Sequence, residues 1–128
     1  MPDTKINIMI VDDQRTTRML VRSSLHGLGY DNVTECSDGE EALRVLGERP
    51  AQLIISDLNM PKLDGIGLLK AVRASAALKS VPFIMLTGRG DGALIKDAIQ
   101  SGVNGYLVKP FNLGALKQKL DTALGAAA

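Results

Sequence analysis

The stretch Ile8-Met9-Ile10-Val11-Asp12-Asp13 joins a short apolar run to two adjacent carboxylates. The stretch Leu53-Ile54-Ile55-Ser56-Asp57 repeats this arrangement with a single acid. Short runs rich in isoleucine and valine are typical of strands that are buried on both faces of a parallel sheet. If both runs are parallel strands, their acids lie at one edge of the sheet, because the carboxyl ends of parallel strands share an edge. In open parallel sheets this edge is where ligands bind.

Two further apolar runs also end in polar groups. Phe83-Ile84-Met85-Leu86 ends at Thr87, and Tyr106-Leu107-Val108 ends at Lys109-Pro110. The four strand ends together present three carboxylates, a hydroxyl and an ammonium. The sequence therefore predicts one polar cluster that is assembled from four separate segments of the chain.

Apolar, β-branched runs alternate with helical patterns along the whole chain. We expect strands near residues 5–11, 33–36, 53–56, 82–86 and 105–108. The segments between and after them carry apolar residues at helical spacing, so each helix has one face to bury. Alternating strands and helices with right-handed crossovers predict an α/β fold, with a doubly wound five-stranded parallel sheet and five helices. The apolar positions that indicate the first, fourth and fifth helices are Val21, Leu25, Leu28, Leu94, Ile95, Ala98, Ile99, Leu113, Leu116, Leu120 and Leu124.

Local signals predict where several helices begin and end. Ser37 and Glu40 have the spacing of a capping box before the second helix. Asp64-Gly65 has the pattern of an N-cap for the third helix, and Gly102 follows the fourth.

Length and composition limit the possible classes of protein. The 128 residues are 45% hydrophobic, which suits one domain over residues 1–128. Fifteen basic and fourteen acidic residues give a net charge of +1, and the chain has no tryptophan. Without a basic block or stacking aromatics, we expect no nucleic-acid partner. No segment has a signal-peptide pattern or membrane-spanning length, and Cys36 has no second cysteine to pair with. We therefore expect a cytoplasmic protein without membrane contact, with Cys36 as a small buried hydrophobe.

The three acids at the predicted sheet edge favour a bound cation. Carboxylates that lie close together repel one another, so they hold either protons or a cation. Ligands that are all oxygen suit Mg²⁺, which also accepts phosphate oxygens. At about 4 Å and an effective dielectric of about 20, each bare carboxylate would repel an incoming negative charge by roughly 4 kcal/mol. A dication between the acids, with Lys109 opposite, turns this repulsion of the incoming group into attraction. Phosphoryl transfer requires such neutralisation of the negative charge. Asp57 stands alone and is the best nucleophile, which leaves Asp12 and Asp13 to hold the metal.

Five short segments together carry a resemblance to a known family. With them the chain resembles the receiver domain of response regulators, of the single-domain CheY type, over essentially its whole length. The strand order is taken from this resemblance, because such domains are a known example of the flavodoxin-like order. The segments are Val11-Asp12-Asp13, Ser56-Asp57-Leu58-Asn59-Met60-Pro61, Asp64-Gly65, Leu86-Thr87-Gly88 and Val108-Lys109-Pro110-Phe111.

The resemblance implies a specific chemistry at the cluster. Asp57 would accept a phosphoryl group from a histidine kinase or a small phosphodonor. The chain would catalyse only its own phosphorylation and dephosphorylation, and so would not be an enzyme acting on other substrates. The residues implied around Mg²⁺ are Asp12, Asp13, Asp57 and the backbone carbonyl of Asn59.

The resemblance also implies how the phosphoryl oxygens are bound. Thr87 and Lys109 match the hydroxyl and ammonium that contact them, and the Lys109-Pro110 bond is typically cis in such domains. Gly88 departs from the alanine that the family often has after this threonine. We expect that glycine to widen the approach to the site.

A switch toward a partner follows from the same resemblance. Phosphorylation would draw the Thr87 hydroxyl inward and leave space for the ring of Tyr106. The surface changed would be the fourth helix, the fifth strand and the fifth helix. We expect a monomer whose partners are a histidine kinase and a downstream protein such as the flagellar motor switch. Because the chain ends after the fifth helix, we expect a role in chemotaxis rather than in gene regulation. A regulator that binds the flagellar motor and a phosphate sink that drains a shared kinase need the same residues, so both remain open.

Two other functions fit the sequence less well. One is a Mg²⁺-dependent phosphohydrolase of the haloacid dehalogenase type with an aspartyl nucleophile at Asp57. Such enzymes carry that nucleophile after the first strand, and the neutral Asn59 cannot act as an acid or base. The other is a flavodoxin-like FMN carrier, for which the chain lacks a phosphate-cradling loop after the first strand and flanking aromatic residues.

Overall fold

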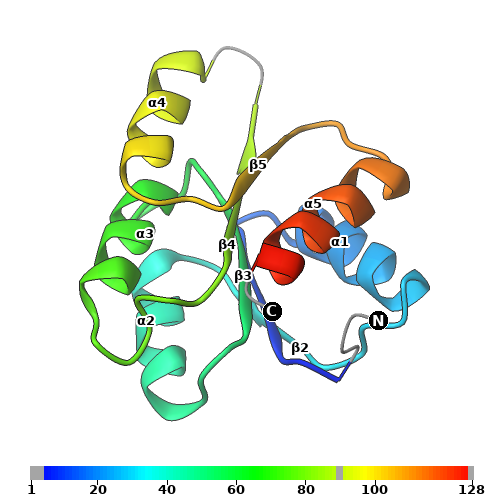
Figure 1. Cartoon of the computed structure of the whole chain (residues 1–128), viewed down its shortest axis with the longest axis horizontal. Coiled ribbons are helices and arrows are strands. Elements are labelled where there is room, and N and C mark those ends of the chain that lie inside the picture. Colours follow the sequence, from blue (N-terminus) through cyan, green and yellow to red (C-terminus); the bar gives the residue numbers. More distant parts are fainter. Residues whose placement is uncertain (1–4, 89–90, 127–128) are drawn as a thin grey trace.

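Strands and helices alternate along the chain from end to end (Figure 1). The computed structural model describes residues 5–88 and 91–126. The strands in these ranges form one parallel sheet in the order β2-β1-β3-β4-β5, which confirms the doubly wound α/β fold. In chain order the elements are β1 (Ile8–Val11), α1 (Arg15–Gly27), β2 (Val33–Cys36), α2 (Gly39–Glu48), β3 (Leu53–Asp57), α3 (Gly65–Ala74), β4 (Phe83–Thr87), α4 (Gly92–Gln100), β5 (Gly105–Val108) and α5 (Leu113–Ala126).

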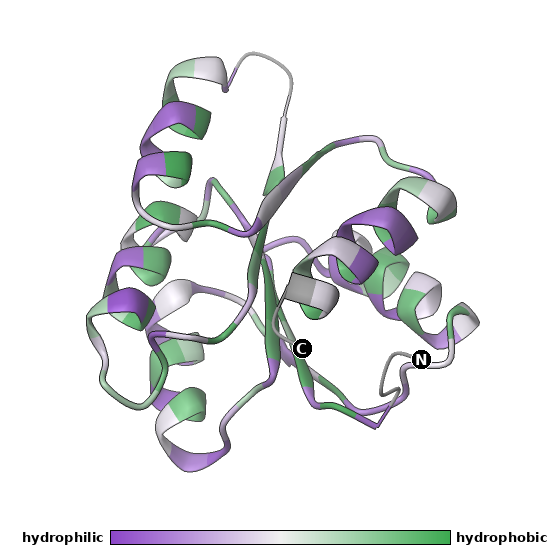
Figure 2. Ribbon diagram, in the orientation of Figure 1, coloured by the Kyte–Doolittle hydropathy of each residue, from purple (hydrophilic) through white to green (hydrophobic). Residues whose placement is uncertain are grey.

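The helices cover both faces of the sheet. Figure 1 shows α1 and α5 on one face and α2, α3 and α4 on the other. Successive side chains of a strand point to opposite faces, so β1 contributes Ile8 and Ile10 to the α1/α5 side and Met9 and Val11 to the other. The inner strands are therefore mainly apolar, as Figure 2 shows by their colour, and the polar residues of β3 and β4 lie at their carboxyl ends.

Several predicted boundaries were wrong by one to three residues. The third strand ends at Asp57 rather than at Ser56, and the fourth runs over Phe83–Thr87 rather than over residues 82–86. The first strand begins at Ile8 rather than at residue 5, because the Asn7 N–H donates to the Gln52 side chain instead of to a neighbouring strand. The cap of α2 is Asp38 rather than Ser37. The Asp38 carboxylate accepts from the Glu41 N–H at 2.8 Å, and the Glu41 carboxylate accepts from the Ser37 N–H at 2.8 Å. The side-chain cap therefore lies one residue later than predicted, and the returning bond from Glu41 goes to the residue before the cap rather than to the cap itself.

Other local predictions were correct. The Asp64 side chain caps α3 by accepting from the Gly67 N–H at 2.8 Å. Gly102 follows α4 with a φ of +97°, a left-handed conformation that favours glycine. Cys36 is buried at the end of β2. Burial, reinforced by the charge of Glu41, raises the pKa of its thiol to about 12, so the thiol stays protonated and unreactive.

The apolar pattern of α4 is only partly buried. Ala98 is buried, but Leu94 and Ile99 are 41% and 56% exposed. The expectation that this helix buries its whole apolar face was therefore wrong. None of the described helices combines the length and apolar character that crossing a bilayer requires.

Candidate functional site

The three predicted acids meet at the carboxyl ends of β1 and β3. Val11 lies opposite Ser56 in the register of these parallel strands, so Asp12 and Asp57 follow at neighbouring positions. One carboxylate oxygen from each of Asp12, Asp13 and Asp57 lies within 4.8 Å of the others. Asp12 and Asp57 are buried, whereas Asp13 is exposed. The cluster therefore has two enclosed acids and one that faces solvent.

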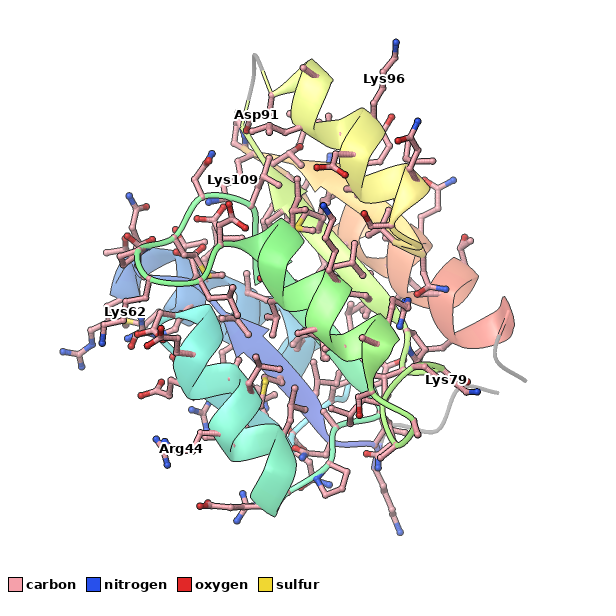
Figure 3. The ribbon with its side chains drawn as sticks, turned by 90° about the vertical axis from the view of Figure 1, so that its left-hand side faces the viewer. Arg44, Lys62, Lys79, Asp91, Lys96 and Lys109 are labelled. Atoms are coloured by element: carbon pink, nitrogen blue, oxygen red, sulfur yellow. The ribbon has the colours of Figure 1, made fainter. Side chains whose placement is uncertain are left out.

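Lys109 reaches this cluster from the end of β5. Its Nζ lies 3.1 Å from Asp57 Oδ1 and 3.5 Å from Asp12 Oδ2. The Lys109 N–H donates to the Thr87 carbonyl at 2.7 Å, which extends the pairing of β4 and β5 up to the site. The Lys109-Pro110 bond is cis, as the resemblance implies. In Figure 3, Lys109 lies close to the loop that joins β3 to α3, at the end of the molecule opposite Lys79.

The charges at the site alter two pKa values. Burial raises the pKa of Asp12 above its ordinary value of 3.8, and the nearby charge of Asp57 raises it further, although the Gln14 N–H and Lys109 act in the opposite direction. Burial alone would lower the pKa of the Lys109 ammonium. Its hydrogen bond to Asp57 and the charges of Asp57 and Asp12 outweigh that effect, so this pKa is raised. The lysine therefore stays charged at neutral pH.

The loop after β3 is held closely against the strand end. The Gly65 N–H donates to the Leu58 carbonyl at 2.9 Å, and a Cβ at Gly65 would overlap the Asp57 carbonyl oxygen. Only glycine permits this approach. The Leu58 N–H in turn donates to Asp57 Oδ1 at 2.9 Å, which orients the carboxylate.

Thr87 places a buried hydroxyl at the end of β4. Its Oγ1 has no hydrogen-bond partner among residues 5–88 and 91–126. A buried hydroxyl without a partner costs about 1–3 kcal/mol. An anionic oxygen bound at the acid cluster would supply that partner.

The donor set fits Mg²⁺. The three clustered ligands are all carboxylates, without histidine or cysteine, and oxygen ligands are what Mg²⁺ prefers. Two of the acids are buried with one lysine between them, so negative charge remains in excess. A dication would offset this excess.

Magnesium affinity should depend on pH because of Asp12. The folded state holds a proton on Asp12 at higher pH than the unfolded chain does, so stability of the metal-free protein falls as pH rises from 3.8 through the raised pKa. A Mg²⁺ ion bound at this carboxylate would compete with the proton. We therefore expect the Mg²⁺ dissociation constant to increase by up to about tenfold for each pH unit below that pKa, as measured by calorimetric titration between about pH 4 and pH 7. Affinity that is constant over this range would contradict the prediction, and Asp12→Asn is the control that should reduce the dependence to that of the remaining carboxylates.

Two other predicted residues belong to the loop after β3 and to β5. Asn59 is exposed in the loop two residues beyond Asp57. Tyr106 is 37% exposed in β5, and Lys119 Nζ lies 5.6 Å from the centre of its ring. The ring is therefore partly exposed and partly covered by Lys119.

Three polar residues around the site were not predicted from the sequence. Arg18 donates to the Asp12 backbone carbonyl at 2.7 Å and to Glu35 at 3.1 Å. Asp91 accepts from the Gly88 N–H at 2.8 Å, next to Thr87. Contacts between side chains and distant backbone atoms leave no periodic signal in a sequence. The only available signal was the position of Arg18 one turn into α1, after the acid pair.

Comparison with known proteins agrees with this arrangement. The chain is 45% identical over 122 residues, 95% of each chain, to the "Probable chemotaxis protein CheY" of Rhizobium etli. It is 44% identical to chemotaxis protein CheY-3 of Vibrio cholerae, over 91% of this chain and 89% of that one. The solved structure of Vibrio cholerae chemotaxis protein CheY4 superposes with a TM-score of 0.86 at 35% identity, covering 94% of this chain and 99% of that chain. Residues 8–121 match the response regulator receiver domain. With this match and a fold whose acids meet at the sheet edge, the chain belongs to the family of response regulator receiver domains.

Proposed function

We propose that this chain is a phosphoacceptor response regulator in which Asp57 takes a phosphoryl group from a histidine kinase with Mg²⁺. The observation that carries the proposal is the meeting of three carboxylates and one ammonium at the carboxyl ends of β1, β3 and β5. This arrangement combines a nucleophile, a cation site and a fixed positive charge. The chain is thus a signalling regulator whose chemistry is limited to its own phosphorylation and dephosphorylation.

The transfer forms one bond and breaks another. A carboxylate oxygen of Asp57 attacks the phosphorus of the donor, and the bond from phosphorus to the kinase histidine nitrogen breaks. The leaving imidazole keeps the electron pair of that bond and the acyl phosphate remains on Asp57. Because Oδ1 accepts from the Leu58 N–H and lies against Lys109, we assign the attack to Oδ2. With acetyl phosphate as donor, acetate leaves instead.

The surrounding residues neutralise and orient the transferred group. Asp12, Asp13, Asp57 and the Asn59 carbonyl would hold Mg²⁺, which would supply positive charge for the phosphoryl oxygens. Lys109 supplies a second positive charge, 3.1 Å from Asp57 Oδ1. The buried Thr87 hydroxyl donates a hydrogen bond to a phosphoryl oxygen, which gives this group the partner it otherwise lacks.

We propose that the output of this regulator lies in chemotaxis. The relatives it resembles carry that role in their names. The partners would be a chemotaxis kinase and a downstream protein such as the flagellar motor switch, reached in the cytoplasm by a monomer. A phosphate sink that drains a shared kinase would use the same site.

Exposed apolar side chains support one face as the partner surface. Most of the large apolar side chains that are exposed in the described part of the chain lie on α4, β5 and α5. We call them the α4–β5–α5 face: Leu94, Ile99, Tyr106, Val108 and Leu113, which are 37–56% exposed. Phosphorylation would reach this face through Thr87, since β4 and β5 pair directly beside it.

Incubation with acetyl phosphate and Mg²⁺ tests the phosphoacceptor proposal. We expect the intact mass to rise by one phosphoryl group per chain, with the label on Asp57 after borohydride trapping and peptide mapping. Beryllofluoride should compete for the same site. Rapid multiple turnover of many phosphoesters without a trapped intermediate would instead indicate the phosphohydrolase.

Tyr106→Ala tests the partner face. We expect phosphorylation by acetyl phosphate to stay unchanged, because the variant keeps the three acids and Lys109. Binding of the beryllofluoride form to a flagellar switch protein should weaken by about tenfold, since exposed aromatic residues are common anchors of interfaces. Leu20→Ala is the matched control, because Leu20 is 55% exposed on α1, a helix that contributes no residue to the α4–β5–α5 face. Equal binding by the Tyr106 variant and the wild type would contradict the prediction.

A further inference from the structure

Arg18 connects the acid cluster to the edge strand of the sheet. Its Nη1 donates to the Asp12 backbone carbonyl at 2.7 Å, and its Nε donates to Glu35 Oε1 at 3.1 Å. The other Glu35 oxygen accepts from Arg22 Nη1 at 2.7 Å. Only 17% of the Arg18 side chain is exposed, against 54% of the Arg22 side chain. We propose that Arg18 is a positioning residue that holds the Asp12–Asp13 peptide in the orientation the cation requires, an inference that rests on the proposed function.

The atom that Arg18 contacts explains how it acts. The Asp12 carbonyl belongs to the planar peptide unit that also contains the Asp13 N and Cα. Fixing that carbonyl fixes the plane, and the plane sets the direction in which the Asp13 side chain leaves the backbone. Asp13 is exposed, so contact with the core does not hold it in place.

The same peptide segment is tied to β2 at two points. The Asp12 N–H donates to the Cys36 carbonyl at 3.1 Å, and the Asp12 carbonyl is tied through Arg18 to Glu35, the residue before Cys36. The Asp12 carboxylate is itself held by the Gln14 N–H at 2.8 Å. The turn after β1 is therefore braced against the repulsion of three like charges.

Glu35 keeps the charge of Arg18 from weakening the cation site. An unpaired guanidinium beside the acids would repel a dication. Hydrogen bonds from Arg22 and Arg18 hold the pKa of Glu35 below its ordinary value, against the effect of burial, so this carboxylate is ionised at neutral pH and offsets the charge of Arg18. Arginine suits this position because its planar fork donates to two acceptors at once, which a lysine ammonium does less well.

Arg18→Met and Arg22→Met form a matched pair that tests the proposal. Both changes remove one arginine from Glu35 and keep most of the apolar stem, but only the first removes the bond to Asp12. We expect calorimetric titration with Mg²⁺ to give a dissociation constant about tenfold higher for Arg18→Met, because residues that orient metal ligands typically contribute 10–100-fold to affinity. Arg22→Met should stay within about twofold of the wild type.

A second measurement needs no metal. In the metal-free protein, the Gln14 amide should exchange its hydrogen about tenfold faster in Arg18→Met than in Arg22→Met, because the turn that protects it is no longer braced. Amides of β3 and β4 should exchange alike in both variants. A purely structural role for Arg18 would speed exchange across the sheet rather than at this turn.

The outcomes separate the two proposals. Equal Mg²⁺ affinity in Arg18→Met and Arg22→Met would overturn the role of Arg18. A wild-type chain that binds no Mg²⁺ would overturn the proposed function itself. If Arg18→Met does not fold, Arg18→Lys keeps the charge and should still weaken Mg²⁺ binding by at least about threefold, because its single ammonium does not reproduce the two-acceptor fork; unchanged affinity there would equally overturn the role.

Discussion

Asp57→Asn is expected to lower phosphate incorporation from acetyl phosphate by more than about 10³-fold, because a neutral amide oxygen is a far weaker nucleophile than a carboxylate. The substitution keeps the size of the side chain and the acceptor for the Leu58 N–H. Loss of activity would therefore reflect chemistry rather than packing. Intact mass spectrometry over a time course measures the rate, and circular dichroism checks the fold.

Asp13→Asn is the matched control for Asp57→Asn. It removes a negative charge from the same cluster but leaves the nucleophile in place. We expect its loss of rate to be largely recovered by raising the Mg²⁺ concentration, since the change weakens only the cation site. Phosphorylation of Asp57→Asn should not recover at any Mg²⁺ concentration. Incorporation by Asp57→Asn at a rate close to that of the wild type would show that another residue accepts the phosphoryl group.

Lys109→Met should change transfer rate and metal affinity in opposite directions. The rate at saturating Mg²⁺ should fall by about 10²-fold, because the variant lacks the positive charge that meets the phosphoryl oxygens. The Mg²⁺ dissociation constant should decrease, because the ammonium 3.1 Å from Asp57 and 3.5 Å from Asp12 no longer competes with the cation. Stopped-flow phosphorylation and calorimetry measure the two effects separately.

Lys62→Met controls for a general loss of positive charge near the site. Lys62 lies in the loop after β3, and its side chain is 63% exposed. Its Nζ lies 3.8 Å from Asp38 Oδ2, and Asp38 is not one of the clustered acids. We expect its rate and affinity to stay close to those of the wild type. A parallel loss of both rate and affinity in Lys109→Met would indicate that this lysine holds the site together instead of acting on the phosphoryl group.

The convergence of the acids could be predicted from the sequence because parallel strands constrain it strongly. Asp12 and Asp57 each follow an apolar run, and parallel strands bring their carboxyl ends to one edge whatever the details of packing. Thr87 and Lys109 follow for the same reason, one strand and two strands farther along the sheet. The roles of these residues in phosphoryl transfer stay predictions.

The bracing of the site by Arg18 could not be predicted in the same way. An arginine one turn into a helix looks like any solvated surface charge. Its contact depends on how α1 packs against β2, which brings Glu35 to its Nε from seventeen positions away. The cap of α2 shows the same limit on a smaller scale. Ser37 and Asp38 are both good N-cap residues, and each has an acid three residues later. In the structure Asp38 is the cap, and the next residue, Gly39, donates its N–H to the carbonyl of Leu63, a residue distant in the chain.

Residue pattern alone determined the alternation of strands and helices along the chain, the parallel sheet and the polar residues at its carboxyl edge. These features follow from local periodicity and from the geometry shared by all parallel sheets. Only the tertiary structure decided which capping register forms, that Leu94 and Ile99 of α4 stay exposed, and that Arg18 holds the Asp12 carbonyl. The physical reason is that each of these outcomes depends on neighbours that are distant in the chain, and a local pattern carries no information about those neighbours.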